Sequence, residues 1–360
     1  MTGNALQPAF PALADALPYI SLTALPTPLD EAPALARHLG LSSLAIKRDD
    51  LTSAVYGGNK VRKLDYLLAD ALARGCDSVV TFGAVGSNHA LATAVFAQRL
   101  GLACHVVLVP QATTPYVAAT LRYHLHIGTI LHAARNFSHS REFLEQIRKT
   151  HPQGPGRVCE IPWGGSNWLG AAGFVAAALE LAAQIKASGV APPDFIYLAA
   201  GSMGTVIGLA LGLRVADLDT RIVAPRVVPF GATAANRVVE LVTEANRELH
   251  ARDAGFPLVS DPGGNVELRT EFLGTGYAEA TPEALEAVAL MHELEHLKLE
   301  TTYTGKAFAG VVTDARSGRL TGKRVIFWNT YNSAPYPAEL QNIDTSALPA
   351  ELEPYLRAGS

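Results

Sequence analysis

The stretch SVVTFGAVGSNHALATAVFAQRLGLACHVVLV, from Ser78 to Val109, contains the pattern that decides the fold class. An apolar run at Ser78–Phe82 is followed by a glycine-containing turn, a helical pattern at Asn88–Leu100 and a second apolar run at Ala103–Val109. Short, uniformly apolar runs are typical of strands that are buried on both faces of a parallel sheet. A strand, a helix and a second strand in this order predict a βαβ unit.

The same alternation continues on both sides of this stretch. Lys60–Ala73 carries apolar residues at helical spacing. We expect further strands at Thr129–His132, Phe195–Ala199, Arg221–Val227 and Arg324–Trp328. The chain is therefore predicted to be an α/β protein with a mostly parallel sheet. Its proline-rich ends, including the segment after Tyr331, are expected to form arms packed over the surface.

Composition narrows the class of protein further. Of the 360 residues, 49% are hydrophobic and 17% are charged, and the formal net charge is −4. This mixture can fill a large core, and the thin spread of Lys and Arg gives no electrostatic support for binding nucleic acid or an anionic membrane. Three distant cysteines (Cys76, Cys104 and Cys159) make a disulfide framework unexpected, and no Lys or Arg precedes Arg37. Both features favour a cytoplasmic location.

Two uncharged windows of 19 residues, Ile161–Leu179 and Phe195–Leu213, are long enough to span a bilayer. Polar, glycine-rich residues interrupt both windows, at Gly164-Gly165-Ser166-Asn167 in one and Gly201-Ser202-Met203-Gly204 in the other. We therefore expect buried strands, loops and buried helices in series, and no membrane span.

Lys60 stands where a helix is expected to begin, directly after Gly57-Gly58-Asn59, with Asn59 as the candidate N-cap. The positive end of the helix and the cations Arg62 and Lys63 should lower the pKa of this lysine. A lysine that forms a Schiff base must spend time as the free amine, so this setting suits one. Taken alone, Lys60 is better explained as a solvated lysine on an amphipathic helix, and only its combination with the neighbouring motifs favours the Schiff base.

Five ordered motifs, spread between about Thr23 and Asn332, closely resemble the D-cysteine desulfhydrase and 1-aminocyclopropane-1-carboxylate deaminase family. The motifs are Lys47-Arg48-Asp49-Asp50-Leu51 with Gly57–Leu64, Gly86-Ser87-Asn88-His89, Ile161–Asn167, Gly274-Thr275-Gly276-Tyr277, and Tyr303-Thr304-Gly305-Lys306-Ala307. Together they are far more specific than any one of them.

The resemblance implies a tryptophan-synthase-β-like fold, with two open, twisted, mostly parallel sheets and helices on both faces. Pyridoxal 5′-phosphate would lie in the cleft between two lobes. Residues 1–55 and 166–360 would form the large cofactor-binding domain, and residues 56–165 the small domain. The resemblance also implies a homodimer that acts on a small amino acid.

Roles carried over from the family make Lys60 the lysine that holds the cofactor and removes the Cα proton. Ser87, Asn88 and His89 would hold the substrate carboxylate near a helix N-terminus, where free backbone N–H groups attract anions. Tyr277 and Tyr303 would flank the substrate as proton donors or orienting groups, and Ser87 would share in catalysis. The remaining cofactor contacts would be Asn59, Asn88, Gly201, Ser202, Met203, Gly204, Thr205, Thr304 and Thr330, and Tyr331 would contact the substrate.

Three positions favour the desulfhydrase over the deaminase pattern, which has Glu, Gln and Leu where this chain has Thr304, His89 and Thr330. A Thr hydroxyl at the pyridine nitrogen gives a neutral hydrogen bond and a weaker electron sink than Glu, sufficient when a thiolate leaves the β-carbon. D-Cysteine, converted to pyruvate, ammonia and sulfide, is the expected substrate. Asn329-Thr330-Tyr331-Asn332 replaces the usual His-Thr-Gly-Gly, which keeps L-cysteate and 1-aminocyclopropane-1-carboxylate open. Met203 stands where glycine is common.

Two functions of other classes, a zinc hydrolase and a binding protein without catalysis, are alternatives to this interpretation. His292-Glu293-Leu294-Glu295-His296 matches the zinc-protease pattern H-E-x-x-H. On a helix from Pro282 to Leu299, however, both histidines fall opposite the apolar stripe, so we expect a solvated face and no metal site. A binding protein that kept the fold and lost the chemistry is the second alternative.

Overall fold

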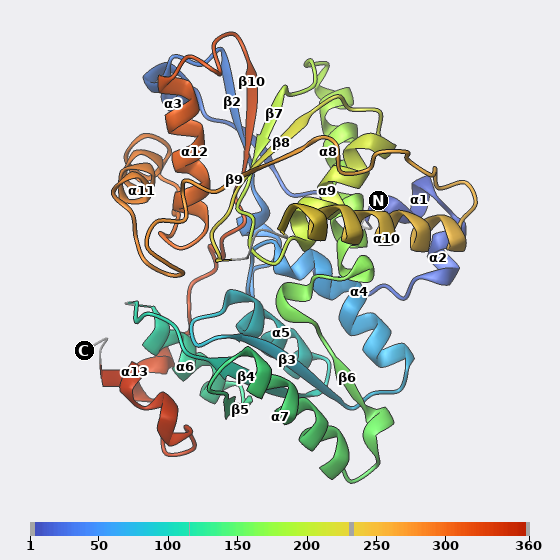
Figure 1. Cartoon of the computed structure of the whole chain (residues 1–360), viewed down its shortest axis with the longest axis vertical. Coiled ribbons are helices and arrows are strands. Elements are labelled where there is room, and N and C mark those ends of the chain that lie inside the picture. The colour runs from blue at the N-terminus through green and yellow to red at the C-terminus, as the bar shows by residue number, and fades with distance from the viewer. Residues whose placement is uncertain (1–3, 115, 230–233, 358–360) are drawn as a thin grey trace.

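The computed structural model describes residues 4–114, 116–229 and 234–357, and within them the strands form two sheets (Figure 1). The six-stranded sheet has the order β1-β2-β10-β7-β8-β9, and the four-stranded sheet has the order β5-β4-β3-β6. Every neighbouring pair is parallel except β1 with β2. The strands are β1 (Leu29–Glu31), β2 (Ser43–Lys47), β3 (Ser78–Ala84), β4 (Ala103–Val109), β5 (Ile130–Ala133), β6 (Val158–Glu160), β7 (Phe195–Tyr197), β8 (Arg221–Pro225), β9 (Val266–Arg269) and β10 (Arg324–Trp328).

The sequence predicted six of these strands, with ends that differ by up to two residues, and missed the short strands β1, β2, β6 and β9. The predicted helix at Lys60–Ala73 is α4 with the same bounds, and Asn88–Leu100 corresponds to α5 (Asn88–Arg99). The other long helices are α3 (Pro33–Leu39), α6 (Val117–His126), α7 (Phe137–Thr150), α8 (Trp168–Ser188), α9 (Gly204–Val215), α10 (Ala234–Arg252), α11 (Pro282–Glu295) and α12 (Thr304–Arg316).

Alternate residues of the central strands face different cores, as the two-residue period of a strand requires. In β10, Val325 and Phe327 pack into a core with α3, α11 and α12, whereas Ile326 and Trp328 pack into the larger core with α4, α8 and α9. Burial on both faces explains why these strands read as continuous apolar runs. Figure 1 shows α11 and α12 on one side of this sheet and α8, α9 and α10 on the other.

A buried ionic network fixes the start of α4 to the large sheet. Arg62 donates to Asp49 and to Glu180, and Lys47 at the end of β2 donates to Glu180 at 2.5 Å. All four side chains are almost fully buried. Removing one partner of a buried ion pair is costly because the other charge is then left without a partner and without water. The network therefore holds the first turn of α4, next to Lys60, in one place.

The cysteines depart from the prediction. Cys76 and Cys159 form a disulfide, whereas Cys104 is free and buried. Cys76 lies just before β3 and Cys159 lies in β6, and the parallel pairing of these two strands brings the cysteines together. A separation of 83 residues gave no sign of this proximity.

The two uncharged windows fold as expected. Ile161–Leu179 runs from the end of β6 through a loop into α8, and Phe195–Leu213 contains β7, a loop and α9. Within the described residues, one helical segment, Trp163–Ser188, has the length and hydropathy to cross a bilayer, and 72% of its most apolar window is buried inside the protein. Burial accounts for its apolar composition.

Candidate active site

A cavity of about 400 Å³ lies between the two sheets, near the carboxyl ends of β3 and β7. This is where ligands bind in open α/β sheets. Every residue predicted for the site lines the cavity except Gly204, which lies directly behind the lining. The predicted residues on its wall are Asn59, Lys60, Ser87, Asn88, His89, Gly201, Ser202, Met203, Thr205, Tyr277, Tyr303, Thr304, Thr330 and Tyr331.

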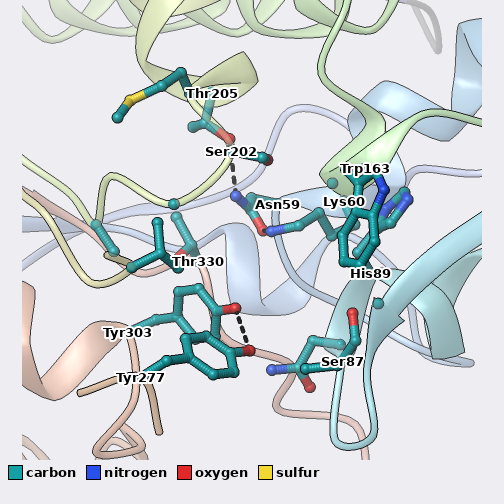
Figure 2. A pocket seen from close by; sticks show the side chains of 18 of the residues that line it. Asn59, Lys60, Ser87, His89, Trp163, Ser202, Thr205, Tyr277, Tyr303 and Thr330 are labelled. Carbon is teal, nitrogen blue, oxygen red and sulfur yellow. Dashed lines mark hydrogen bonds between the residues drawn. The ribbon is translucent and has the colours of Figure 1, made fainter. Parts of the chain in front are cut away.

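Lys60 is the first residue of α4, and its amine lies within the cavity wall (Figure 2). Its Nζ donates to Asn59 Oδ1 at 2.9 Å and lies 6.0 Å from the centre of the Tyr303 ring. Burial lowers the pKa of Lys60 to about 8, while the carboxylate of Glu300 acts in the opposite direction. The lowered pKa agrees with the prediction, but its main cause is burial, not the neighbouring cations.

Asn59 does not cap α4, contrary to the prediction. Its backbone is helical and its side chain makes no capping hydrogen bond. Its amide instead donates to Thr205 Oγ1 at 2.8 Å and accepts from Lys60. This side chain therefore joins the lysine to the first turn of α9, as the dashed line to Thr205 in Figure 2 shows.

The turn before Lys60 is held by the segment after β10. Asn332 Oδ1 accepts from Gly57 N at 2.7 Å, and Asn59 N donates to Thr330 O. Gly58 has a φ of +95°, and a β-carbon there would meet Thr330 O at 3.0 Å. The Asn332 amide thus supports the Gly57 turn and is absent from the cavity lining, whereas Tyr331 does line the cavity.

Ser87, Asn88 and His89 form the start of α5. Ser87 Oγ accepts from Ala90 N and so caps the helix, and Asn88 Oδ1 accepts from Tyr56 Oη. His89 Nε2 lies 3.0 Å from Thr81 Oγ1, and burial, reinforced by Lys60, lowers the pKa of His89. A histidine kept neutral in this way brings no full charge, so an anion at this turn would have to be held mainly by backbone N–H groups.

Residues Gly201–Thr205 form the entry to α9, and Gly204 has no room for a side chain. A β-carbon on Gly204 would lie 2.5 Å from Ser166 Oγ and 2.8 Å from Lys63 Nζ. Gly204 N donates to Ser166 Oγ. Met203, where the family commonly has glycine, adopts a left-handed φ of 73° with its side chain buried. This conformation is one that glycine adopts at lower cost.

Lys63 and Ser166 were not predicted as site residues. Lys63 Nζ donates to Gly164 O at 2.9 Å and lies 3.5 Å from Ser166 Oγ. Burial, followed by the charge of Lys60, lowers the pKa of Lys63 well below its ordinary value. The spacing offered a usable signal, because residues three apart on a helix share a face, so Lys63 lies on the same side of α4 as Lys60.

Two tyrosines form the opposite wall. Tyr277 Oη and Tyr303 Oη lie 2.7 Å apart, and the dashed line in Figure 2 marks this contact on the side facing Ser87. Burial raises the pKa of both phenols, so both stay protonated near neutral pH. Protonated phenols in mutual contact can donate or relay a proton.

Glu300 is an acidic residue of the cavity that the sequence analysis missed. Its carboxylate accepts from the backbone N–H groups of Thr302, Tyr303 and Thr304 at 2.8 Å each. Its own N–H donates to Thr304 Oγ1 at 3.0 Å, and that hydroxyl lies 3.2 Å from Glu300 Oε1. Rotation of the hydroxyl can turn its proton toward a ligand in the cavity. No motif in the sequence pointed to Glu300, since its position follows from how the chain enters α12.

An aromatic stack forms the rim on the small-sheet side. Trp163 packs between Phe82, with ring centres 5.7 Å apart, and Phe137, at 5.0 Å. Phe82 is fully buried, whereas Phe137 is 61% exposed. The stack therefore runs from the core to solvent along one side of the cavity and gives the site an apolar edge.

The histidine pair of the H-E-x-x-H match lies outside this cavity. His292 and His296 are exposed, and α11 ends at Glu295, with His296 in a left-handed conformation. Among the described residues no group of three potential metal ligands is present. The geometry of a two-histidine helical metal site is therefore missing.

The donors present fit pyridoxal 5′-phosphate. The buried amine of Lys63 contacts a carbonyl oxygen and a hydroxyl, and neither of these groups is anionic. The N-terminus of α9 faces the same place, and its N–H groups with a buried cation suit a phosphate. Lys60, with its lowered pKa, suits the aldehyde.

Comparison with known proteins agrees with this fit. A sequence model described as "Pyridoxal-phosphate dependent enzyme" matches residues 20–330. A putative 1-aminocyclopropane-1-carboxylate deaminase of Pyrococcus horikoshii is 34% identical over 330 residues, covering 90% of this chain and 95% of that protein. A D-cysteine desulfhydrase of Klebsiella pneumoniae is 33% identical over 324 residues, covering 88% of this chain and 94% of that protein.

Solved structures extend the agreement to three dimensions. The crystal structure of an ACC deaminase homologue, 32% identical, superposes with a TM-score of 0.78 over 94% of this chain and 99% of that one. A serine racemase from Dictyostelium discoideum, 17% identical, superposes with a TM-score of 0.60 over 92% and 98%, which shows the shared fold alone. The chain belongs to the pyridoxal-phosphate-dependent enzyme family, among relatives named as 1-aminocyclopropane-1-carboxylate deaminases and D-cysteine desulfhydrases.

Proposed function

We propose that this enzyme removes a leaving group from the β-carbon of a small amino acid, with D-cysteine as the preferred substrate and pyruvate, ammonia and sulfide as products. The observation that carries the choice is that Thr304, a hydroxyl residue, lines the cavity; its hydroxyl accepts from Glu300 N and lies 3.2 Å from the Glu300 carboxylate. A hydroxyl donor at a ring nitrogen supports elimination of a thiolate, whereas cyclopropane opening calls for an acid there.

Pyridoxal phosphate, when bound, supplies an electron sink for the charge that develops at Cα. Lys60 binds the cofactor and, with a pKa of about 8, takes the Cα proton near neutral pH. The N–H groups at the start of α5 orient the substrate carboxylate. Lys63 and the N-terminus of α9 hold the phosphate, so the reacting carbon stays in reach of the lysine.

The tyrosine pair completes the proposed roles. Tyr303 and Tyr277 keep their protons because burial raises their pKa values, and they face Ser87 across the cavity. From there they hold a proton ready for the departing sulfur. The aromatic rim with Trp163 limits access of water from one side.

A panel of D-cysteine, L-cysteate and 1-aminocyclopropane-1-carboxylate tests the substrate, with pyruvate or 2-oxobutanoate measured as product. D-Cysteine should give the highest kcat/KM, and Lys60→Ala should abolish turnover while Lys149→Ala, at an exposed lysine, leaves it unchanged. A higher kcat/KM for 1-aminocyclopropane-1-carboxylate would refute the argument from Thr304. Turnover by Lys60→Ala would refute the role of the lysine.

The domain boundaries at residues 55/56 and 165/166, a homodimer and a cytoplasmic location belong to the same proposal. The Cys76–Cys159 disulfide argues against the last of these, since disulfides are rare in reducing compartments. A thiol count on denatured protein isolated without reductant from its native host tests this: three free thiols support a cytoplasmic location, and one argues against it. Sedimentation of the purified protein tests the dimer.

A further inference from the structure

The chain after β10 forms an arm that lies on the small-sheet side of the molecule (Figure 1). It contains the short helices η4 (Ala338–Asn342), η5 (Ala350–Leu352) and α13 (Pro354–Arg357), and η4 and α13 pack against α6. Leu340, Leu348 and Leu352 of this arm are buried. The family's sequence model ends at residue 330, so this arm lies beyond the matched region.

Tyr355 in α13 holds the backbone of one residue at two points. Its hydroxyl accepts from Gln111 N at 3.2 Å and donates to Gln111 O at 3.1 Å. Gln111 lies just past the carboxyl end of β4, beside the cavity. One hydroxyl thus satisfies both backbone groups of Gln111 and holds the backbone from which its side chain extends.

The Gln111 side chain passes this constraint to the predicted carboxylate-binding turn. Its Oε1 accepts from Gly86 N at 2.9 Å, and Gly86 immediately precedes Ser87. A β-carbon on Gly86 would lie 2.9 Å from Val117 Cγ2 and 3.1 Å from Gln111 Nε2. Gly86 is thus packed directly against the side chain of Gln111, the residue whose backbone Tyr355 holds.

Tyr116, which follows Gln111 by five residues, reaches the other wall of the cavity. Tyr116 Oη lies 2.9 Å from Thr302 Oγ1, and Thr302 precedes Tyr303 of the tyrosine pair. Gln111 therefore contacts the turn before Ser87, and Tyr116 contacts the residue before Tyr303. Neither Tyr355, Gln111 nor Gly86 lines the cavity among the described residues.

We propose that Tyr355 is a positioning residue for substrate binding, which acts through Gln111 on the Gly86–Ser87 turn. The inference rests on the proposed function, in which the N–H groups of this turn hold the substrate carboxylate. Hydrogen bonds to a carboxylate depend on the direction of each N–H, so a turn released from Gln111 binds substrate less well. The reacting groups at Lys60 stay in place, and the chemical step is unaffected.

The first test compares Tyr355→Phe with Glu353→Gln, a control next to the same short helix that breaks the exposed pair between Glu353 and Arg357. With the best substrate of the panel, Tyr355→Phe should raise KM about 3- to 10-fold and change kcat less than about twofold, the pattern of lost binding without lost chemistry. Glu353→Gln should leave both unchanged. An unchanged KM, or a fall confined to kcat, would overturn the proposal.

A second test needs no turnover. Hydrogen exchange in the holoenzyme, followed in peptides covering residues 84–91, reports on the Gly86 N–H. Tyr355→Phe should speed this exchange about tenfold and Glu353→Gln should not. In Gln111→Leu, which removes the acceptor, adding Tyr355→Phe should have no further effect on exchange or KM.

The two tests distinguish failure of the proposed function from failure of the positioning role of Tyr355. A wild-type enzyme that turns over no substrate on the panel refutes the proposed function, and the exchange measurement still decides the link from Tyr355 to Gly86. Unchanged exchange in Tyr355→Phe, or independent effects of the Tyr355 and Gln111 substitutions, overturns the link. Faster exchange with an unchanged KM overturns the role in binding substrate.

Discussion

If Lys60 holds the cofactor, as proposed, its protonation sets how readily the cofactor binds at neutral pH. With a pKa of about 8, roughly one Lys60 in eleven is an uncharged amine at pH 7. An exposed lysine, with a pKa near 10.4, has only about one in 2,500 uncharged. Burial therefore raises the reactive fraction about 200-fold. Since Glu300 raises the pKa of Lys60, removing its charge should raise the reactive fraction further.

Glu300→Gln tests this reasoning. We expect the rate at which cofactor-free protein captures pyridoxal phosphate, followed by absorbance, to rise about tenfold per pH unit up to about pH 8 in the wild type and then to level off. In Glu300→Gln the levelling should move to lower pH. At pH 7 the gain can be at most about 11-fold, because one wild-type lysine in about eleven is already reactive.

The control is Glu279→Gln, which removes an exposed carboxylate that does not contribute to the pKa of Lys60. It should leave the profile unchanged. Because Glu300 also accepts three backbone N–H groups, thermal melting of Glu300→Gln must accompany the kinetics. A wild-type profile that levels off only near the ordinary pKa of lysine, about 10, or one that moves to higher pH in Glu300→Gln, would refute the assignment.

Three further substitutions test other parts of the structure. Gly204→Ala, whose β-carbon would meet Ser166 Oγ at 2.5 Å, should weaken cofactor binding at least about tenfold in an equilibrium titration, whereas Gly156→Ala, in open space, should not. Arg62→Met leaves the buried Asp49 without its ion-pair partner and Glu180 with Lys47 alone, and should cost about 3–5 kcal/mol in urea denaturation; a loss below about 1 kcal/mol would contradict the buried network. Trp163→Ala removes the middle ring of the rim stack and should raise kcat/KM for amino acids larger than D-cysteine relative to D-cysteine itself; an unchanged ratio would show that the rim does not select substrate.

The candidate site could be predicted from sequence where its residues belong to local motifs. Lys60 at the start of a helix, the turn at Ser87 and the glycine loop at Gly201 each follow from neighbouring residues, and all three line the cavity. Lys63 could have been found from its helical spacing to Lys60. Glu300 could not, because its importance lies in the backbone groups of α12 that it binds.

Residue patterns along the chain indicate most of the alternation of strands and helices, because a strand buried on both faces is apolar throughout. Which distant residues meet depends instead on how the whole chain folds. The Cys76–Cys159 disulfide, the turn of Asn59 toward Thr205 and the bonds from Tyr355 to Gln111 each join segments that lie far apart along the chain. Such contacts arise when parallel strands pair and helices pack, and their partners carry no mark of one another in the sequence.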